Sequence, residues 1–184
     1  MTLSEKIERF KKIMTRKDGT PVYTEDTIRK LKELRFFQAP ASSKFHGDYE
    51  GGLFDHSCEV TEILVEMTEN NKLRWEELDS PYIVGMYHDL CKCDQYRKLV
   101  GYDDHGRLYE FNPNTPIKGH GDKSVMMLST FITLTDEEMM CIRYHMGAFC
   151  DKADWGYFTR AVKTYPNVLW THMADMIASQ IRGV

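Results

Sequence analysis

The chain has 184 residues, a length typical of a single domain. Its 24 lysine and arginine residues and 28 aspartate and glutamate residues give a formal net charge of −4, which disfavours non-specific binding along a nucleic-acid backbone. A hydrophobic fraction of 42% excludes wholesale disorder, and no run approaches the roughly 18 apolar residues of a membrane span. The N-terminus lacks an apolar signal core, and the odd number of cysteines, five, indicates reduced thiols in a cytoplasmic protein.

The first 38 residues predict two helices. An apolar stripe defines the first one, and Thr2 and Glu5 have the spacing of a capping box at its start; the stripe consists of Leu3, Ile7, Phe10 and Met14. The run from Asp18 to Pro21 breaks this helix, and a second helix is expected over 24–37. Ile28, Leu31 and Leu34 would face inward from it. We expect residues 1–38 to pack on a core formed by residues 39–184.

The middle of the chain predicts a loop followed by two helices. Residues 39–52 are rich in glycine, serine and proline, which is typical of a loop. The helix expected over 54–70 is apolar on more than one face and should be central. Another helix should begin at Asp79-Ser80-Pro81, with proline in its first turn and Ile83, Val84 and Met86 buried.

A small hairpin and several helices are expected to close the chain. Residues 99–102 and 107–111 flank a turn at Asp103–Gly106, which predicts two short strands. Helices are expected over 122–132, 136–145, 157–164 and 167–181, the second of them with a capping box at Thr135 and Glu138. The predicted fold class is all-α, a helical bundle with a minor β-hairpin.

Six residues of metal-ligand type recur along the chain at intervals of 32, 32, 25 and 30 residues, the second position being an adjacent pair; they are His56, His88, Asp89, His120, His145 and Asp175. Each interval corresponds to about one helix and a connection, so the six converge only if several helices direct them into one core. Imidazole with carboxylate suits zinc, iron, manganese or nickel better than calcium. One aspartate can bridge two ions, which makes the set sufficient for a binuclear site.

Lysines near these residues are candidates for binding phosphate. Lys92 follows His88 by four residues and Asp89 by three, so it shares their helical face. There it could hold a phosphate oxygen, or form an ion pair with a nearby carboxylate. Lys123, three residues after His120, is a second candidate, with a solvated helix start as its alternative. His46 could contact a substrate or close its loop.

The order of these residues resembles the HD-domain superfamily of metal-dependent phosphohydrolases, and most of all the HD domain of bacterial 3′-5′ exoribonucleases. The similarity covers about residues 40–181 and rests on six segments: Phe45–His56, His88–Lys92, Asp104–Leu108, Gly119-His120, Tyr144–Gly147 and His172–Asp175. Cys91 replaces the glycine of the HDxGK signature, and Gly47 and Met146 stand where histidines are common. Residues 1–38 suffice only for two helices, so we expect no nucleic-acid-binding domain before residue 39. Together with the net charge of −4, this favours a small phosphorylated substrate over RNA.

The resemblance implies an HD-domain bundle over residues 39–184 with two divalent transition metal ions, manganese, iron, nickel, cobalt or zinc. His56, His88, Asp89 and Asp175 would hold one ion, and Asp89 would bridge to a second ion on His120 and His145. A metal-bound hydroxide would attack phosphorus, because a bound ion lowers the pKa of water to about 7. Asp89 and Lys92 would be catalytic, and Lys92, Lys123 and His46 would contact substrate.

The expected function is hydrolysis of a phosphomonoester or phosphodiester in a nucleotide or another small phosphorylated molecule. No membrane partner is expected, nucleic acid is not favoured, and the sequence does not indicate an oligomeric state. The same ligand order also resembles di-iron HD-domain oxygenases, which the residues do not distinguish from hydrolases. A catalytically silent module that binds metal or nucleotide is the third interpretation.

Overall fold

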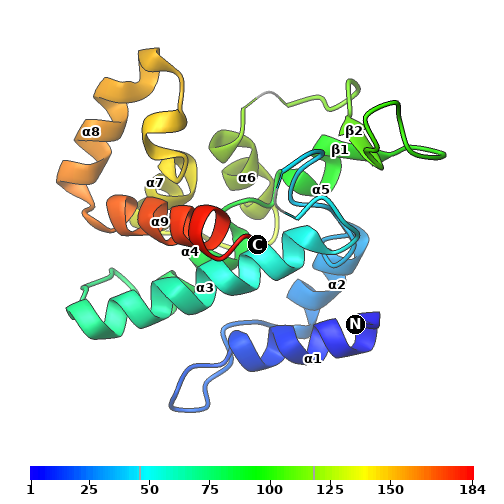
Figure 1. Cartoon of the computed structure of the whole chain (residues 1–184). Helices are drawn as coiled ribbons and strands as arrows, with labels where there is room; N and C mark the ends of the chain where they lie inside the picture. Colours follow the sequence, from blue (N-terminus) through cyan, green and yellow to red (C-terminus); the bar gives the residue numbers. More distant parts are fainter. Residues whose placement is uncertain (46, 118) are drawn as a thin grey trace.

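A computed structural model describes residues 1–45, 47–117 and 119–184 (Figure 1). It is mostly helical with a two-stranded antiparallel hairpin, which confirms the predicted fold class. In chain order the elements are α1 (Leu3–Ile13), α2 (Glu25–Glu33), α3 (Gly52–Asn71), α4 (Ser80–Tyr87), α5 (Lys92–Gln95), β1 (Tyr96–Lys98), β2 (Tyr109–Phe111), α6 (Gly121–Leu128), α7 (Asp136–Tyr144), η1 (Gly147–Phe149), η2 (Lys152–Asp154), α8 (Trp155–Thr164), α9 (Asn167–Met176) and η3 (Ile177–Ile181).

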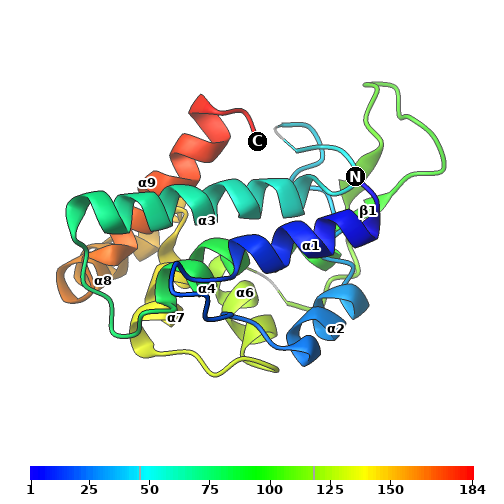
Figure 2. The same cartoon turned by 90° about the horizontal axis from the view of Figure 1, so that it is seen from below.

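The long helix α3 is central, as predicted from its apolar residues. Its N-terminal two thirds are largely buried, and the buried positions lie on more than one face. Helices α4 and α9 pack against it. Figure 2 shows α1 running alongside α3 on another side. An element enclosed in this way can carry side chains into the interior, and His56 is one of them.

The N-terminal helices join the same core. The predicted capping box of α1 is present, with the Thr2 hydroxyl accepting from the Glu5 amide. Phe10 is fully buried and meets the ring of Phe37 edge-on at a centroid distance of 6.0 Å, and the Phe37 ring in turn lies 5.3 Å from that of Phe54 in α3. Residues 1–38 therefore contact the bundle through aromatic side chains, whereas a domain boundary between residues 38 and 39 stays a prediction.

Helix α2 ends four residues before the predicted end at residue 37. Arg35 adopts a left-handed conformation with φ 60°, and the Phe36 amide then donates to the Leu31 carbonyl at 3.0 Å. This is the hydrogen-bond pattern of a helix end at which glycine is usual. The early end turns Phe36 and Phe37 into the core, where both are fully buried.

The predicted hairpin is present, but its first strand lies before the predicted range 99–102. β1 begins at Tyr96, and Tyr96 pairs with Phe111, Arg97 with Glu110 and Lys98 with Tyr109. Residues 99–102 therefore belong to the connection between the strands, not to the first strand. Helix α6 also ends at Leu128, four residues before its predicted end at residue 132.

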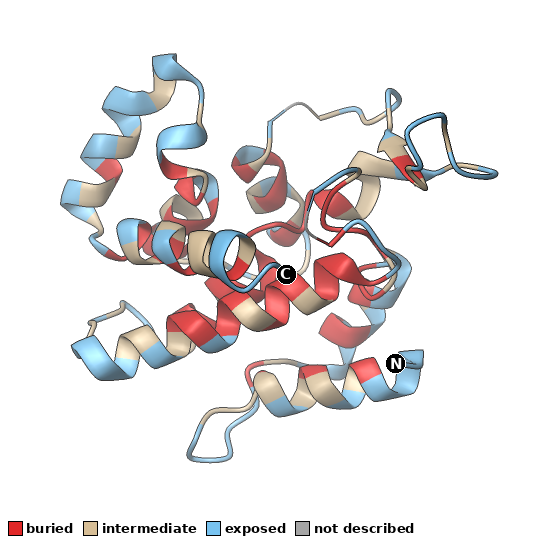
Figure 3. Cartoon of the chain, viewed as in Figure 1, coloured by how far each residue is buried: buried red, intermediate tan, exposed pale blue. Residues whose placement is uncertain are grey.

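Buried residues concentrate where α3, α4 and the segment before α3 meet (Figure 3). Hydrophobic residues from most of the helices, α1 and α9 included, form one core cluster. Inside this region lie histidine, aspartate and lysine side chains, which are costly to bury unless they are paired. Within the described residues, no helix is long and apolar enough to cross a membrane.

Candidate metal centre

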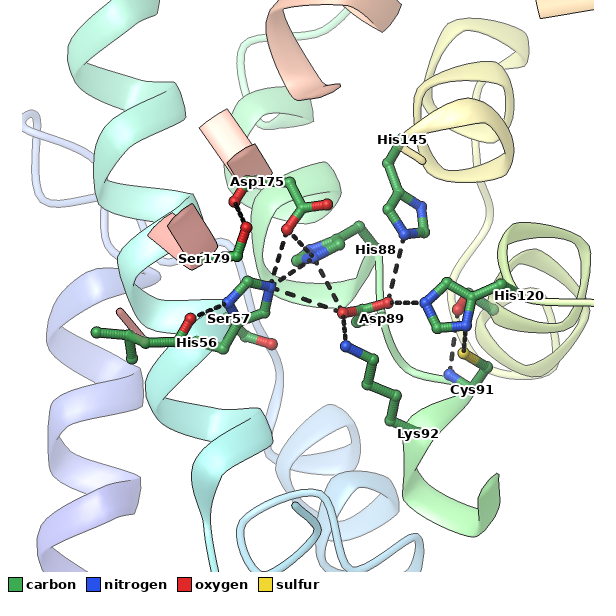
Figure 4. A network of polar contacts seen from close by, with 12 residues as sticks. His56, Ser57, His88, Asp89, Cys91, Lys92, His120, His145, Asp175 and Ser179 are labelled. Atoms are coloured by element: carbon green, nitrogen blue, oxygen red, sulfur yellow. Dashed lines mark hydrogen bonds and ion pairs between the residues drawn. The ribbon is translucent and has the colours of Figure 1, made fainter. Parts of the chain in front are cut away.

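The six predicted ligand residues converge in the interior of the bundle (Figure 4). They come from α3, the end of α4, the start of α6, the end of α7, and α9; in that order they are His56, His88 with Asp89, His120, His145 and Asp175. His56, His88, Asp89 and His145 are buried, while the side chains of His120 and Asp175 are 25% and 15% exposed. The structure thus brings together residues separated by up to 119 positions in the sequence.

Two glycines allow the helices that carry these residues to approach closely. A Cβ at Gly85 of α4 would lie 2.6 Å from the Thr61 Cα of α3, closer than carbon atoms pack. A Cβ at Gly121 of α6 would lie 2.1 Å from the Arg143 carbonyl oxygen of α7. The first contact brings His88 next to His56, and the second brings His120 next to His145.

One half of the cluster is built around His56, His88 and Asp175. The Nε2 atom of His56 lies 3.1 Å from Asp175 Oδ1 and 3.3 Å from the Nε2 atom of His88. Asp89 Oδ2 lies 3.4 Å from His88 Nε2 and 3.7 Å from His56 Nε2. Two ligands that are each about 2.1 Å from one ion at tetrahedral angles are about 3.4 Å apart. The spacing of these donor atoms therefore suits one shared ion.

The other half of the cluster is built on the second oxygen of the same carboxylate. Asp89 Oδ1 lies 2.7 Å from His120 Nε2 and 3.3 Å from His145 Nε2. In Figure 4, His56 and His88 lie on one side of Asp89 and His120 and His145 on the other. Each oxygen of Asp89 thus faces its own pair of imidazoles, which is the arrangement of a bridging carboxylate.

All four imidazoles direct Nε2 into the cluster and use Nδ1 elsewhere. The Nδ1–H groups donate to the backbone oxygens of Val184 from His56 (2.8 Å), of Gly85 from His88 (2.8 Å) and of Ile142 from His145 (2.6 Å). A backbone oxygen can only accept, so it holds the proton on Nδ1 and directs the Nε2 lone pair into the cluster, where it can bind a metal ion. His120 differs, because its Nδ1 lies 3.3 Å from Cys91 Sγ.

The electrostatics keep the central carboxylates ionised. Burial by itself would raise the pKa of Asp89, but the charge of Lys92 and the neighbouring histidines hold it well below its usual value. Burial acts in the same direction on Asp175, where the contact with His56 and the electrostatic effect of His88 outweigh it and lower the pKa. Burial lowers the pKa of His120, which keeps that ring neutral.

The donor set fits divalent transition metal ions. Asp89 Oδ1 and His145 Nε2 are buried and have no hydrogen-bond partner in the described part of the chain, although imidazole and carboxylate atoms surround them. Groups of three such ligand atoms lie within 4.8 Å of one another, one with His56, His88 and Asp175 and one with His88, Asp89 and His145. Buried, mutually facing acceptors are unfavourable without a cation between them. The clusters can therefore hold metal ions.

Lys92 completes the cluster on its open side. Its ammonium lies 2.6 Å from Asp89 Oδ2, so the ion pair considered from the sequence is present. Burial would lower the pKa of Lys92, but the Asp89 charge raises it overall and keeps the group cationic. A cavity of about 810 Å³ reaches the same atoms, with Asp89, Lys92 and His120 in its wall. The lysine thus borders both the cluster and the space above it.

The other two predicted substrate contacts are placed differently. The ammonium of Lys123 forms an ion pair with Asp94 and a hydrogen bond to the Thr115 hydroxyl. It borders a neighbouring cavity of about 450 Å³ that it shares with His120. A role for Lys123 in substrate binding stays a prediction. His46 lies outside the described residues.

Several residues that support the cluster were not assigned this role from the sequence. The sulfur of Cys91 and the backbone oxygen of Val184 each hold an imidazole. His172 donates from Nδ1 to the carbonyl of His145 at 2.8 Å, which links α9 to the end of α7. The replacement of glycine by Cys91 within the motif was the signal that could have identified the thiol.

Comparison with known proteins gives one partial match. The chain is 34% identical over 79 residues to dihydroneopterin 2′,3′-cyclic phosphate phosphodiesterase from Methanocaldococcus jannaschii. The matched region covers 41% of this chain and 32% of the relative, so the chain spans about a third of the relative's length. No protein-family model and no solved structure matches the chain. The chain is thus distantly homologous to a phosphodiesterase, and its buried histidine and aspartate cluster is consistent with an HD-type metal site.

Proposed function

We propose that this chain is a metal-dependent phosphohydrolase of the HD type, acting on a phosphomonoester or phosphodiester of a small molecule. The observation that carries the proposal is the carboxylate of Asp89, whose two oxygens face two pairs of imidazole Nε2 atoms. Lys92 binds the same carboxylate at the wall of the large cavity. Metal ligands and a fixed cation beside a cavity are the elements that phosphate ester hydrolysis requires.

Each residue has a distinct task in this proposal. His56, His88 and Asp175 would hold one ion, His120 and His145 would hold the other, and Asp89 would contribute one oxygen to each. Bound divalent ions supply an acidified water as nucleophile and offset negative charge on the phosphate. The backbone oxygens at the Nδ1 atoms fix three of the four rings before any substrate enters. This preorganisation reduces the rearrangement needed in the transition state.

Lys92 is proposed to bind a non-bridging phosphate oxygen. Its salt bridge with Asp89 fixes the ammonium beside the cluster, so it need not be ordered when substrate binds. Charge develops on the phosphate oxygens in the transition state, where a positioned cation is most effective. Because the pKa of Lys92 is raised, the ammonium retains its charge at neutral pH.

The cavity favours a substrate with a ring attached to its phosphate. Its volume of about 810 Å³ lies within the range of about 300–1,000 Å³ for small-molecule sites. Aromatic side chains in its wall come from three separate segments and are Phe45, Tyr96 and Phe149. Phe45 and Phe149 are 67% and 68% exposed, so an aromatic ring in the cavity can reach them, and the Lys44 ammonium lies 4.9 Å from the Phe45 ring centroid. We propose a nucleotide or a phosphorylated pterin as the substrate class, the latter because the relative acts on a dihydroneopterin cyclic phosphate.

The proposal is tested by reconstituting the metal-free chain with manganese, iron, cobalt, nickel or zinc and measuring phosphate ester cleavage. Substrates would include 2′,3′-cyclic and 3′,5′-cyclic nucleotides, mononucleotides and dihydroneopterin cyclic phosphate. Asp89→Asn removes a central ligand, and Asp122→Asn, at an exposed carboxylate paired with Arg143, is the matched control. Metal-dependent cleavage that only Asp89→Asn abolishes would support the proposal. Oxygen consumption by an iron-loaded chain without phosphate release would support an oxygenase instead, and metal binding without any turnover a silent module.

A further inference from the structure

One imidazole of the cluster is held differently from the other three. His56, His88 and His145 each bond a backbone oxygen through Nδ1, whereas the Nδ1 atom of His120 faces the Cys91 sulfur at 3.3 Å. His120 is also the most exposed of the four, with a quarter of its side chain accessible. Packing therefore restrains this ring less than it restrains the other three. The orientation of His120 depends more on its contact with the Cys91 sulfur.

A second residue fixes the direction of the hydrogen bond at the sulfur. Gln95 donates from Nε2 to the Tyr96 hydroxyl at 3.3 Å, which directs its Oε1 toward Cys91. The Cys91 thiol donates to that oxygen at 3.5 Å. A thiol has one proton, so a sulfur that donates to Gln95 can only accept from His120. The Nδ1 atom of His120 must then carry the proton, and its Nε2 lone pair points to Asp89 Oδ1.

We propose that Cys91, with Gln95 behind it, is a positioning residue that sets the tautomer and orientation of His120 for the ion shared with His145. The inference rests on the proposed metal site. The backbone amide of Cys91 donates to the Ser124 hydroxyl at 3.1 Å, which ties the cysteine to the helix that His120 begins. The thiol does for His120 what backbone oxygens do for the other rings. A sulfur atom is a weaker partner than a carbonyl, so the ion on this side should also be the first lost to a chelator.

The test is a titration of the metal-free chain with Co²⁺, followed by the visible absorption of the bound ion. Cys91→Ala removes the sulfur, and Cys91→Ser keeps a group that both donates and accepts. Cys93→Ala is the matched control, because it removes a neighbouring thiol that makes no contact with a ligand among the hydrogen bonds described. His120→Ala defines the effect of losing the ligand itself.

The inference predicts that Cys91→Ala weakens binding of the second equivalent by about 10- to 100-fold while the first equivalent is unchanged. Cys91→Ser should recover most of the affinity, and Cys93→Ala should match the wild type. The inference would be overturned if Cys91→Ala titrated like the wild type, or if Cys91→Ala and Cys91→Ser weakened binding of the second equivalent equally. If Cys91→Ala does not fold, the test uses Gln95→Ala, a change at a partly exposed position. This variant must weaken binding of the second equivalent of Co²⁺. A Gln95→Ala protein that titrates like the wild type would overturn the inference.

The outcome also separates this inference from the proposed function. If the wild type and His120→Ala both bind a single equivalent, then His120 holds no ion and the role of Cys91 is refuted. Cleavage of a phosphate ester by that one-ion protein would leave the proposed function intact. If two ions bind and respond to Cys91→Ala but no ester is cleaved, the positioning role stands and the proposed hydrolase does not.

Discussion

Gly85→Ala should separate α3 from α4 and thereby weaken both the fold and the metal cluster. The added Cβ would lie 2.6 Å from the Thr61 Cα and 3.0 Å from its Oγ1. Carbon atoms pack at about 3.5–4.0 Å, so the helices must move apart by about 1 Å. Overpacking against a fixed backbone costs about 3 kcal/mol, and the better helix propensity of alanine returns about 1 kcal/mol. The expected loss in the free energy of unfolding is about 2 kcal/mol.

For a chain of this length, a loss of about 2 kcal/mol corresponds to a fall in Tm of about 4–8 °C. The carbonyl of Gly85 also accepts the Nδ1–H of His88 at 2.8 Å, so the displacement should lower metal affinity as well. Calorimetry and metal titration measure the two effects. Gly101→Ala is the control, because a Cβ there meets nothing within 4 Å. A Gly85→Ala protein with the Tm and metal affinity of the wild type would refute the close-packing argument.

Three further variants test single contacts. Lys92→Met should retain its metal but lower kcat about 100-fold, because a cation at the transition-state charge is lost; unchanged kinetics would assign Lys92 a structural role. Lys123→Met should lower the free energy of unfolding by about 1 kcal/mol, because the buried ammonium loses its ion pair with the partly exposed Asp94, as measured by urea denaturation. If Lys123→Met also raises KM, in addition to lowering the stability, then Lys123 contacts the substrate as well. Phe149→Ala should raise KM about tenfold for an aromatic phosphoester and leave a non-aromatic one unaffected; equal changes would exclude stacking.

Local signals in the sequence predicted where helices begin better than where they end. The capping boxes at Thr2 with Glu5 and at Thr135 with Glu138 are both present, because a capping box depends on residues three positions apart. The end of α2 depends instead on tertiary packing. Arg35 takes a left-handed conformation because Phe36 and Phe37 are buried together, and no glycine marks the position.

The hairpin register could not be read from the sequence for a similar reason. Residues 96–102 have several ways to pair with residues 107–111, and the expected tight turn at 103–106 placed the start of the first strand at residue 99 instead of residue 96. In the structure the connection between the strands is longer, and the Leu99 amide still donates to the Leu108 carbonyl at 2.9 Å beyond the strands. Turn length therefore decided the pairing.

The cluster could be predicted from the residue types and their order, because imidazole and carboxylate groups are rarely buried together unless they bind a ligand or one another. Its supporting contacts were not, because they depend on atoms far apart in the chain. The Nδ1 of His56, for example, donates to the backbone oxygen of Val184, 128 positions away. The position of Lys123 also shows this limit: only the fold reveals that Asp94 and Thr115 bind its ammonium.

The central claim is that one carboxylate, Asp89, organises the metal cluster, and metal content tests it most directly. Elemental analysis would compare the purified wild type with Asp89→Asn and Asp122→Asn. The account predicts about two ions per chain in the wild type and in Asp122→Asn, and the loss of both in Asp89→Asn, because each oxygen of Asp89 faces its own pair of imidazoles. An Asp89→Asn protein that keeps the wild-type metal content would contradict the account.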